Sequence, residues 1–148
     1  MMLVTLLGAS FCWLALAVED AVEFEINPGW LGAAIVGSAL VMASQPGFNW
    51  GDHLGGGLIG LGCGWAVFML NRRAIGQGDI GLFGAMLFVG GADKMVFTVI
   101  LFAGFAFATA LIYASLRKKP FWKAGFPAAI PASCAAVLML FTNSGWRL

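Results

Sequence analysis

Two aspartates stand at the borders of apolar stretches, and their chemistry is the first feature of interest in this chain. Asp20 follows the apolar run 1–18, and Asp79 directly precedes the apolar run 80–89. A carboxylate beside a hydrophobic segment is costly, which points to a function. Two carboxylates held close together share one proton, so that one takes a proton from water while the other polarises a peptide carbonyl. Asp20 and Asp79 are therefore candidate catalytic residues for a hydrolysis that needs no metal and no cofactor.

Each aspartate also has a structural interpretation. Asp20 alone is typical of a solvated acid at a helix end, and Asp79 alone is typical of an N-cap for the helix that follows. The spacing of the two residues along the chain does not show that they meet. Gly76 and Gly78, just before Asp79, permit unusual backbone angles and the close approach of another chain, so we predict that they contact substrate.

The elements that must position these residues are membrane helices. The 148 residues are 61% hydrophobic and 10% charged, with a mean hydropathy of +0.92. Soluble domains are roughly a quarter charged, so we predict an all-α, polytopic membrane protein with a single domain over residues 1–148. With roughly 17–25 residues for each span, the apolar runs predict a bundle of about six helices, at 2–18, 30–44, 54–70, 79–92, 95–116 and 124–142. In the last run, Pro127 and Pro131 predict either a kink or a delayed start.

The basic residues predict the orientation of this bundle. Six spans place the loops 19–29, 71–78 and 117–123 on one side of the membrane, and these loops hold Arg72, Arg73, Arg117, Lys118, Lys119 and Lys123. The positive-inside rule makes this side cytoplasmic and places both termini outside. Asp20 and Asp79 then lie on the cytoplasmic side, whereas Asp52 and Asp93 lie on the other. A net charge of +1 predicts no nucleic-acid partner.

The remaining motifs have mainly structural interpretations. Gly56, Gly60 and Gly64 recur every four residues, so they share one helix face and predict close helix packing. His53 is interpreted as structural. The three cysteines each lie in an apolar run and form no CxxC pair, which predicts buried thiols without metal or disulfide. The first run lacks a preceding Lys or Arg, so we interpret it as a span and not as a signal peptide.

A resemblance to a known family gives the two aspartates a specific context. Gly76-Gln77-Gly78-Asp79 followed by Ile80-Gly81-Leu82 resembles the GxGDxKL signature of the type IV prepilin peptidases, which are membrane aspartic peptidases. In that family a first aspartate precedes an Ile-Pro-Asn stretch by about six residues, and here Asp20 precedes Ile26-Asn27-Pro28 by six positions. The chain is most similar to the short branch, which includes tight-adherence pilus and preflagellin peptidases and lacks the N-methyltransferase segment.

The resemblance implies an endopeptidase of the cell (inner or plasma) membrane whose active site faces the cytoplasm. Asp20 and Asp79 would activate water to remove a short basic leader from a prepilin or pseudopilin precursor, with membrane lipid as the surroundings. The acids Glu19, Glu23 and Glu25 of the first loop would attract that leader, and a solvated acidic loop is the alternative. The resemblance leaves the particular precursor and the oligomeric state open.

Three departures from the family pattern leave two further functions open. Gly81 stands in place of the lysine, Asn27-Pro28 reverses Pro-Asn, and the first loop is acidic where the family is commonly basic. A catalytically degenerate homologue that acts as a scaffold in pilus or secretion assembly is one alternative. A small proton-coupled carrier that uses the two aspartates is the other.

Overall fold

Six α-helices make up the described parts of the chain, which are residues 2–70, 76–117 and 127–144 of a computed structural model. The helices are α1 (Met2–Glu23), α2 (Pro28–Ala43), α3 (Trp50–Leu70), α4 (Gln77–Gly90), α5 (Met95–Arg117) and α6 (Ala129–Asn143). These parts contain no strand, so the prediction of an all-α fold is confirmed. α1, α3 and α5 are long and apolar enough to cross a membrane, whereas α2, α4 and α6 are apolar but shorter.

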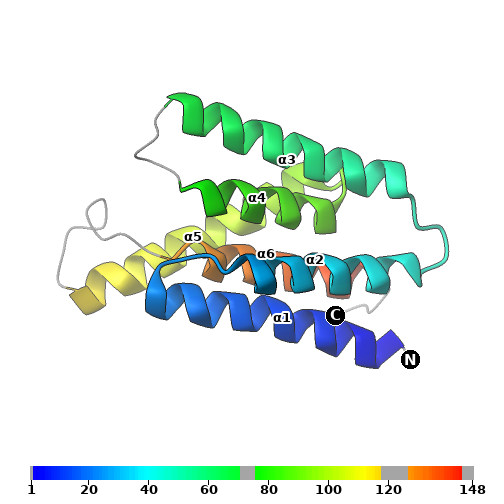
Figure 1. Ribbon diagram of the computed structural model, residues 1–148, viewed down its shortest axis with the longest axis horizontal. Helices are drawn as coiled ribbons and strands as arrows, with labels where there is room; N and C mark the ends of the chain where they lie inside the picture. Colours follow the sequence, from blue (N-terminus) through cyan, green and yellow to red (C-terminus); the bar gives the residue numbers. More distant parts are fainter. Residues whose placement is uncertain (1, 71–75, 118–126, 145–148) are drawn as a thin grey trace.

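Successive helices alternate in direction, so that each end of the bundle collects three helix starts and three helix ends (Figure 1). The carboxyl ends of α1, α3 and α5 lie at the same end as the amino ends of α2, α4 and α6. Asp20, near the end of α1, and Asp79, near the start of α4, therefore lie at one end of the bundle. Of the basic residues used to predict the orientation, Arg72, Arg73, Lys118, Lys119 and Lys123 fall outside the described residues, as does the side chain of Arg117.

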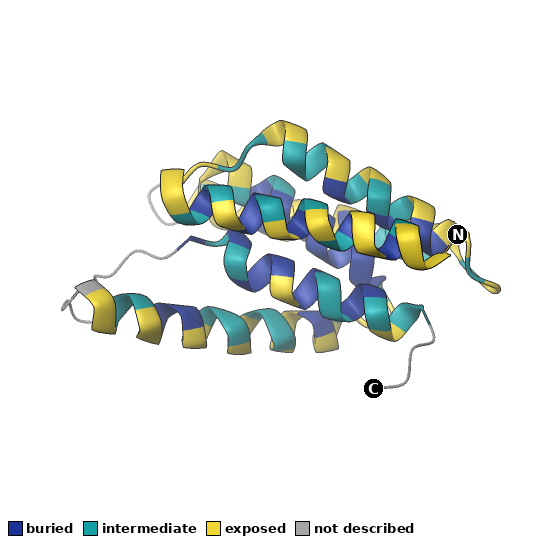
Figure 2. Ribbon diagram, turned by 90° about the horizontal axis from the view of Figure 1, so that it is seen from below, coloured by how far each residue is buried: buried dark blue, intermediate teal, exposed yellow. Residues whose placement is uncertain are grey.

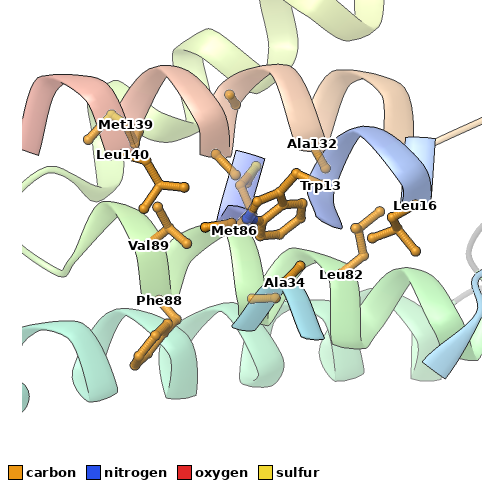
Figure 3. Packing of buried hydrophobic residues seen from close by; sticks show 14 of the residues in the cluster. Trp13, Leu16, Ala34, Leu82, Met86, Phe88, Val89, Ala132, Met139 and Leu140 are labelled. Carbon is orange, nitrogen blue, oxygen red and sulfur yellow. The ribbon is translucent and has the colours of Figure 1, made fainter. Parts of the chain in front are cut away.

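The core forms around α4, which packs against α2, α3, α5 and α6. Trp13 of α1 is fully buried, and its indole Nε1 donates a hydrogen bond to Ser38 Oγ of α2 at 3.0 Å. This bond satisfies the one polar atom of the ring, as a buried tryptophan requires. Figure 3 shows Met86 of α4 and Ala132 of α6 close to the same ring. The bundle is therefore centred on α4, the helix that carries Asp79.

α3 is joined to α4 by a face made only of glycine. The buried residues of α3 are Gly56, Gly57, Gly60 and Gly64, and its other described side chains are exposed or half-buried. A Cβ atom at Gly56 would lie 2.5 Å from the Leu87 carbonyl oxygen, and one at Gly60 would lie 2.9 Å from the Phe83 carbonyl oxygen. The two backbones are therefore in direct contact, as the spacing of the glycines predicted.

The outer faces of the bundle are apolar. On α1 the exposed residues recur at helical spacing: Val4, Leu7, Phe11, Leu14, Val18 and Val22. Figure 2 shows exposed positions repeating along the outer sides of the helices. An apolar face of this size on a water-soluble monomer would promote aggregation, whereas lipid chains solvate it. The surface thus agrees with the membrane-like bundle that composition predicted.

Three helix boundaries differ from those predicted by four residues or more. α3 begins at Trp50, four residues before the predicted start at 54. α1 continues through Glu19 and Asp20 to Glu23, five residues beyond the predicted end of the span, because the charged residues extend the helix past the apolar run. α6 starts at Ala129, not at residue 124. Pro127 and Pro131 predicted either a kink or a delayed start of this helix, and the delayed start is observed. Asp20 therefore lies inside a helix, and the predicted polar loop begins only after Glu23.

Candidate functional site

Asp20 is a buried carboxylate that joins the first helix to the last. It is 4% exposed, and its Oδ2 accepts a hydrogen bond of 2.7 Å from the backbone N–H of Ala129. Ala129 is the first residue of α6, so the carboxylate meets one of the N–H groups that a helix start leaves without a partner. The partial positive charge of the helix start favours a negative group at this position. Asp20 is thus not the solvated helix-end acid of the simplest interpretation.

Asp79 lies in the first turn of α4 and is half-buried. Its Oδ2 accepts a hydrogen bond of 2.8 Å from the backbone N–H of Gly76, the N-cap residue. Asp79 therefore does cap α4, from the third helical position and not as the N-cap itself. Because glycine has no side chain, this bond is the carboxylate half of a capping box.

The two aspartates are close enough for their charges to interact. The carboxylate of Asp79 acts electrostatically on that of Asp20, although 59 positions separate them in the numbering (79 − 20). One oxygen of each carboxylate is held by a backbone N–H, and among the described residues the other oxygen of each has no hydrogen-bond partner. Each carboxylate is therefore anchored to the backbone through one of its two oxygens.

The loop between α1 and α2 packs against the start of α4. Ile26 of this loop lies over Gly78, and a Cβ atom at Gly78 would be 3.0 Å from the Ile26 Cβ. The backbone before Asp79 thus approaches the loop that follows Asp20 at a point where a larger residue would push them apart. The close neighbour of Gly78 is a side chain of this same chain, so Gly78 has a packing role; its predicted contact with substrate stays a prediction, as does that of Gly76.

Gly81 has a packing role as well. A Cβ atom at this position would lie 3.2 Å from Cδ2 of Leu31, on α2. The residue that stands in place of the family's lysine is therefore the point at which α2 approaches α4. A lysine here would have to displace Leu31 before its amine reached the site.

The acidic residues of the first loop differ in their surroundings. Glu23 and Glu25 are exposed. Glu19 is half-buried, and its Oε1 accepts a hydrogen bond of 2.9 Å from Nδ2 of Asn27. Asn27 is also the N-cap of α2, where its Oδ1 accepts the N–H of Gly29 at 2.8 Å. The Glu19–Asn27 pair therefore fixes how the chain leaves α1 and enters α2 next to Asp20.

A second polar cluster lies at the opposite end of the bundle, around a cavity of about 380 Å³ lined in part by Asp52, His53, Asp93 and Lys94. Several of its side chains are bound to one another or to backbone, whereas the buried Nε2 of Gln45 has no hydrogen-bond partner within the described residues. His53 Nδ1 lies 2.7 Å from the carbonyl oxygen of Phe88, which only accepts, so Nδ1 carries the proton. Asp52 Oδ1 accepts the N–H of Asp93 at 3.0 Å.

The partner of His53 shows what this cluster does. Phe88 is in the last turn of α4, and the next carbonyl, that of Val89, accepts Nδ2 of Asn143 at 3.0 Å. Side chains of α3 and α6 thus satisfy the carbonyl groups that the end of α4 leaves free. This contact agrees with the structural interpretation of His53. No group of three or more His, Cys, Asp or Glu side chains suited to a metal occurs within the described ranges.

Sequence reasoning named both aspartates but missed the residues that hold them. Ala129 donates to Asp20 through its backbone, so its residue type carries no signal. Asn27 before Pro28 was a readable signal, because Asn followed by Pro is a common start of a helix. No family model, curated protein or solved structure matches the chain.

Proposed function

We propose that this chain is a membrane-embedded aspartic endopeptidase that removes the short basic leader from type IV prepilin-like precursors. The observation that carries the proposal is the placement of two acids from separate helices, the buried Asp20 of α1 and the half-buried Asp79 of α4, at one end of an apolar bundle. The likeness of Gly76 to Leu82 to the family signature supports the same assignment. Six spans, external termini and a cytoplasmic active site are part of the proposal.

The proposed reaction uses the pair with one proton between its members. The ionised carboxylate takes a proton from water as the water oxygen bonds to the peptide carbonyl carbon. The protonated partner gives its proton to the carbonyl oxygen. The C–N bond then breaks, the amine leaves with the proton that came from water, and the carboxyl product returns a proton to the pair.

The geometry favours an approach of water and peptide to the pair from the side of Asp79. Asp20 is enclosed by protein and held by Ala129, whereas Asp79 is half-exposed at the start of its helix. Asp20 would then act from the buried side of the site, as the carboxylate whose position is fixed. A carboxylate anchored by a backbone N–H keeps its position through the reaction, which is what a catalyst needs in order to avoid reorganisation.

The test is cleavage of a precursor co-expressed with the wild type, Asp20→Asn and Asp79→Asn, read as a gel shift. We expect the wild type to cut and both variants to leave the precursor intact, because an amide does not take a proton from water. Asp93→Asn, an equal change of charge at the opposite end, should cut like the wild type. Cleavage by both active-site variants would show that the site is wrong. Failure of a normally folded wild type on several precursors would favour the scaffold alternative.

A further inference from the structure

Glu19 has a carboxylate oxygen that the fold leaves without a partner. Its Oε1 accepts from Asn27, but its Oε2 is buried and has no hydrogen bond within the part of the chain that the structure describes. A buried acceptor without a donor costs about 1–3 kcal/mol, and more when it belongs to a charged group. This residue lies directly before Asp20 in the last turn of α1.

The position of this carboxylate is set by its neighbours. Asn27 uses its Oδ1 for the Gly29 N–H at the start of α2, so its amide nitrogen must face Glu19. The loop therefore presents one donor and leaves the second oxygen open. Rotation about the last torsion of a glutamate is soft, so the half-buried side chain can turn this oxygen towards an arriving donor without breaking the fold.

The donor that fits best is a cation. A single carboxylate oxygen beside an apolar bundle is stabilised most by a charged N–H group, because charge-assisted hydrogen bonds are roughly twice as strong as neutral ones. Glu23 and Glu25 are exposed, so salt and water screen their attraction for a cation. Glu19 is partly shielded from water and next to the proposed catalytic pair, which distinguishes it from the other two.

We infer that Glu19 is a specificity-determining residue, which turns its unpaired Oε2 to receive a lysine or arginine side chain of the peptide. The inference rests on the proposed function, since the peptide is the substrate of the neighbouring Asp20 and Asp79. The same chemistry would also suit the ammonium of a lipid headgroup, and the experiment separates these two sources of the cation.

The test compares Glu19→Gln with the wild type, in full-length protein in liposomes, on two precursors. One precursor has its basic leader, and the other has each leader Lys or Arg replaced by Gln. Glutamine keeps the shape and an oxygen for Asn27 but has no charge. We expect KM for the basic leader to rise about tenfold or more, with kcat little changed and KM for the neutral leader unaffected. Asp93→Asn serves as the control for loss of one negative charge.

Reversing the charge of both residue 19 and the leader makes the test specific. Glu19→Lys should cut a precursor with an acidic leader better than one with a basic leader, reversing the preference of the wild type. If Glu19→Gln raises KM equally for both leaders, the cation is not on the peptide, and a lipid or a purely structural role explains the residue. No change in KM with either leader would also overturn the inference.

A binding measurement keeps this inference separate from the proposed function. If the wild type cuts no precursor, the proposed function fails, and Glu19 is then tested by fluorescence anisotropy of a labelled basic peptide. The protein is held in nanodiscs of phosphatidylcholine, which has no primary ammonium. Weaker binding by Glu19→Gln, by about tenfold, would retain the cation site without the peptidase. Equal binding by both proteins would reject it.

Discussion

At the scale of single residues, Asp20 combines a candidate catalytic role with a structural one. Its carboxylate links α1 to the start of α6 by a hydrogen bond, and it reaches a backbone N–H that lies 109 positions further along the chain. A residue with both roles complicates mutagenesis, because loss of activity can follow from loss of structure. The choice of substitution separates the two effects.

Asp20→Ala should destabilise the protein more than Asp20→Asn does. Alanine leaves the buried Ala129 N–H without an acceptor, at a cost of about 1–3 kcal/mol, whereas the amide oxygen of asparagine replaces it. We expect both variants to be inactive but only the alanine variant to show a lower midpoint of thermal unfolding in detergent. Equal midpoints for the two variants would show that the Ala129 bond contributes little.

The two aspartates could be predicted from the sequence, but their contacts could not. Asp20 and Asp79 are recognisable because acids are rare in so apolar a chain. The bond from Ala129, by contrast, depends on where α6 begins, and a backbone donor is the same for every residue except proline. The open oxygen of Glu19 is also invisible in sequence, since it results from the orientation of Asn27.

At the scale of helices, the glycine face of α3 determines how closely α3 and α4 approach each other. Leu61 of α3 packs against Gly84, but at Gly56 and Gly60 the nearest atoms of α4 belong to the main chain. These two positions tolerate little change in volume, because main-chain atoms of a helix cannot move aside.

Gly56→Ala tests this interface against a control on the same helix. The new Cβ would lie 2.5 Å from the Leu87 carbonyl oxygen, so the helices must separate, and we expect a loss of stability of about 1–3 kcal/mol. Gly62→Ala meets nothing within 4 Å and should be neutral or stabilising by up to about 1 kcal/mol, because alanine favours helix. The measurement is thermal or denaturant unfolding in detergent, and equal effects would contradict the interface.

The helices themselves were largely predictable, and their ends were less so. Each of the six apolar runs became a helix, and the spacing of glycines on α3 identified its buried face. Hydropathy placed the end of α1 at residue 18, but a helix does not stop where the apolar residues stop. α1 ends at Glu23, and the next residue, Phe24, has a φ of 56°, a conformation unusual for a residue with a side chain.

At the scale of the whole molecule, the alternating helices predict that the two ends of the bundle face opposite sides of the membrane. Single cysteines introduced at Gln77 and at Asn49, in a variant without the three native cysteines, test this arrangement. We expect a membrane-impermeant maleimide to label position 49 in intact cells and position 77 only after the membrane is opened. The reverse pattern would invert the proposed orientation, and labelling of both positions from one side would contradict the bundle.

The short central helix has a consequence for the lipid around it. α4 has 14 residues, so it is about 21 Å long at 1.5 Å per residue, whereas the hydrocarbon of a bilayer is roughly 30 Å thick. A helix of this length cannot have one end at each surface of such a layer. Its carboxyl end, where His53 and Asn143 bind the carbonyl groups of Phe88 and Val89, is the end that would lie below the surface. With α4 as a span, as proposed above, the leaflet opposite Asp79 would thin or admit hydration water at the cavity beside His53. The stability of the protein would then depend on the acyl-chain length of the surrounding lipid.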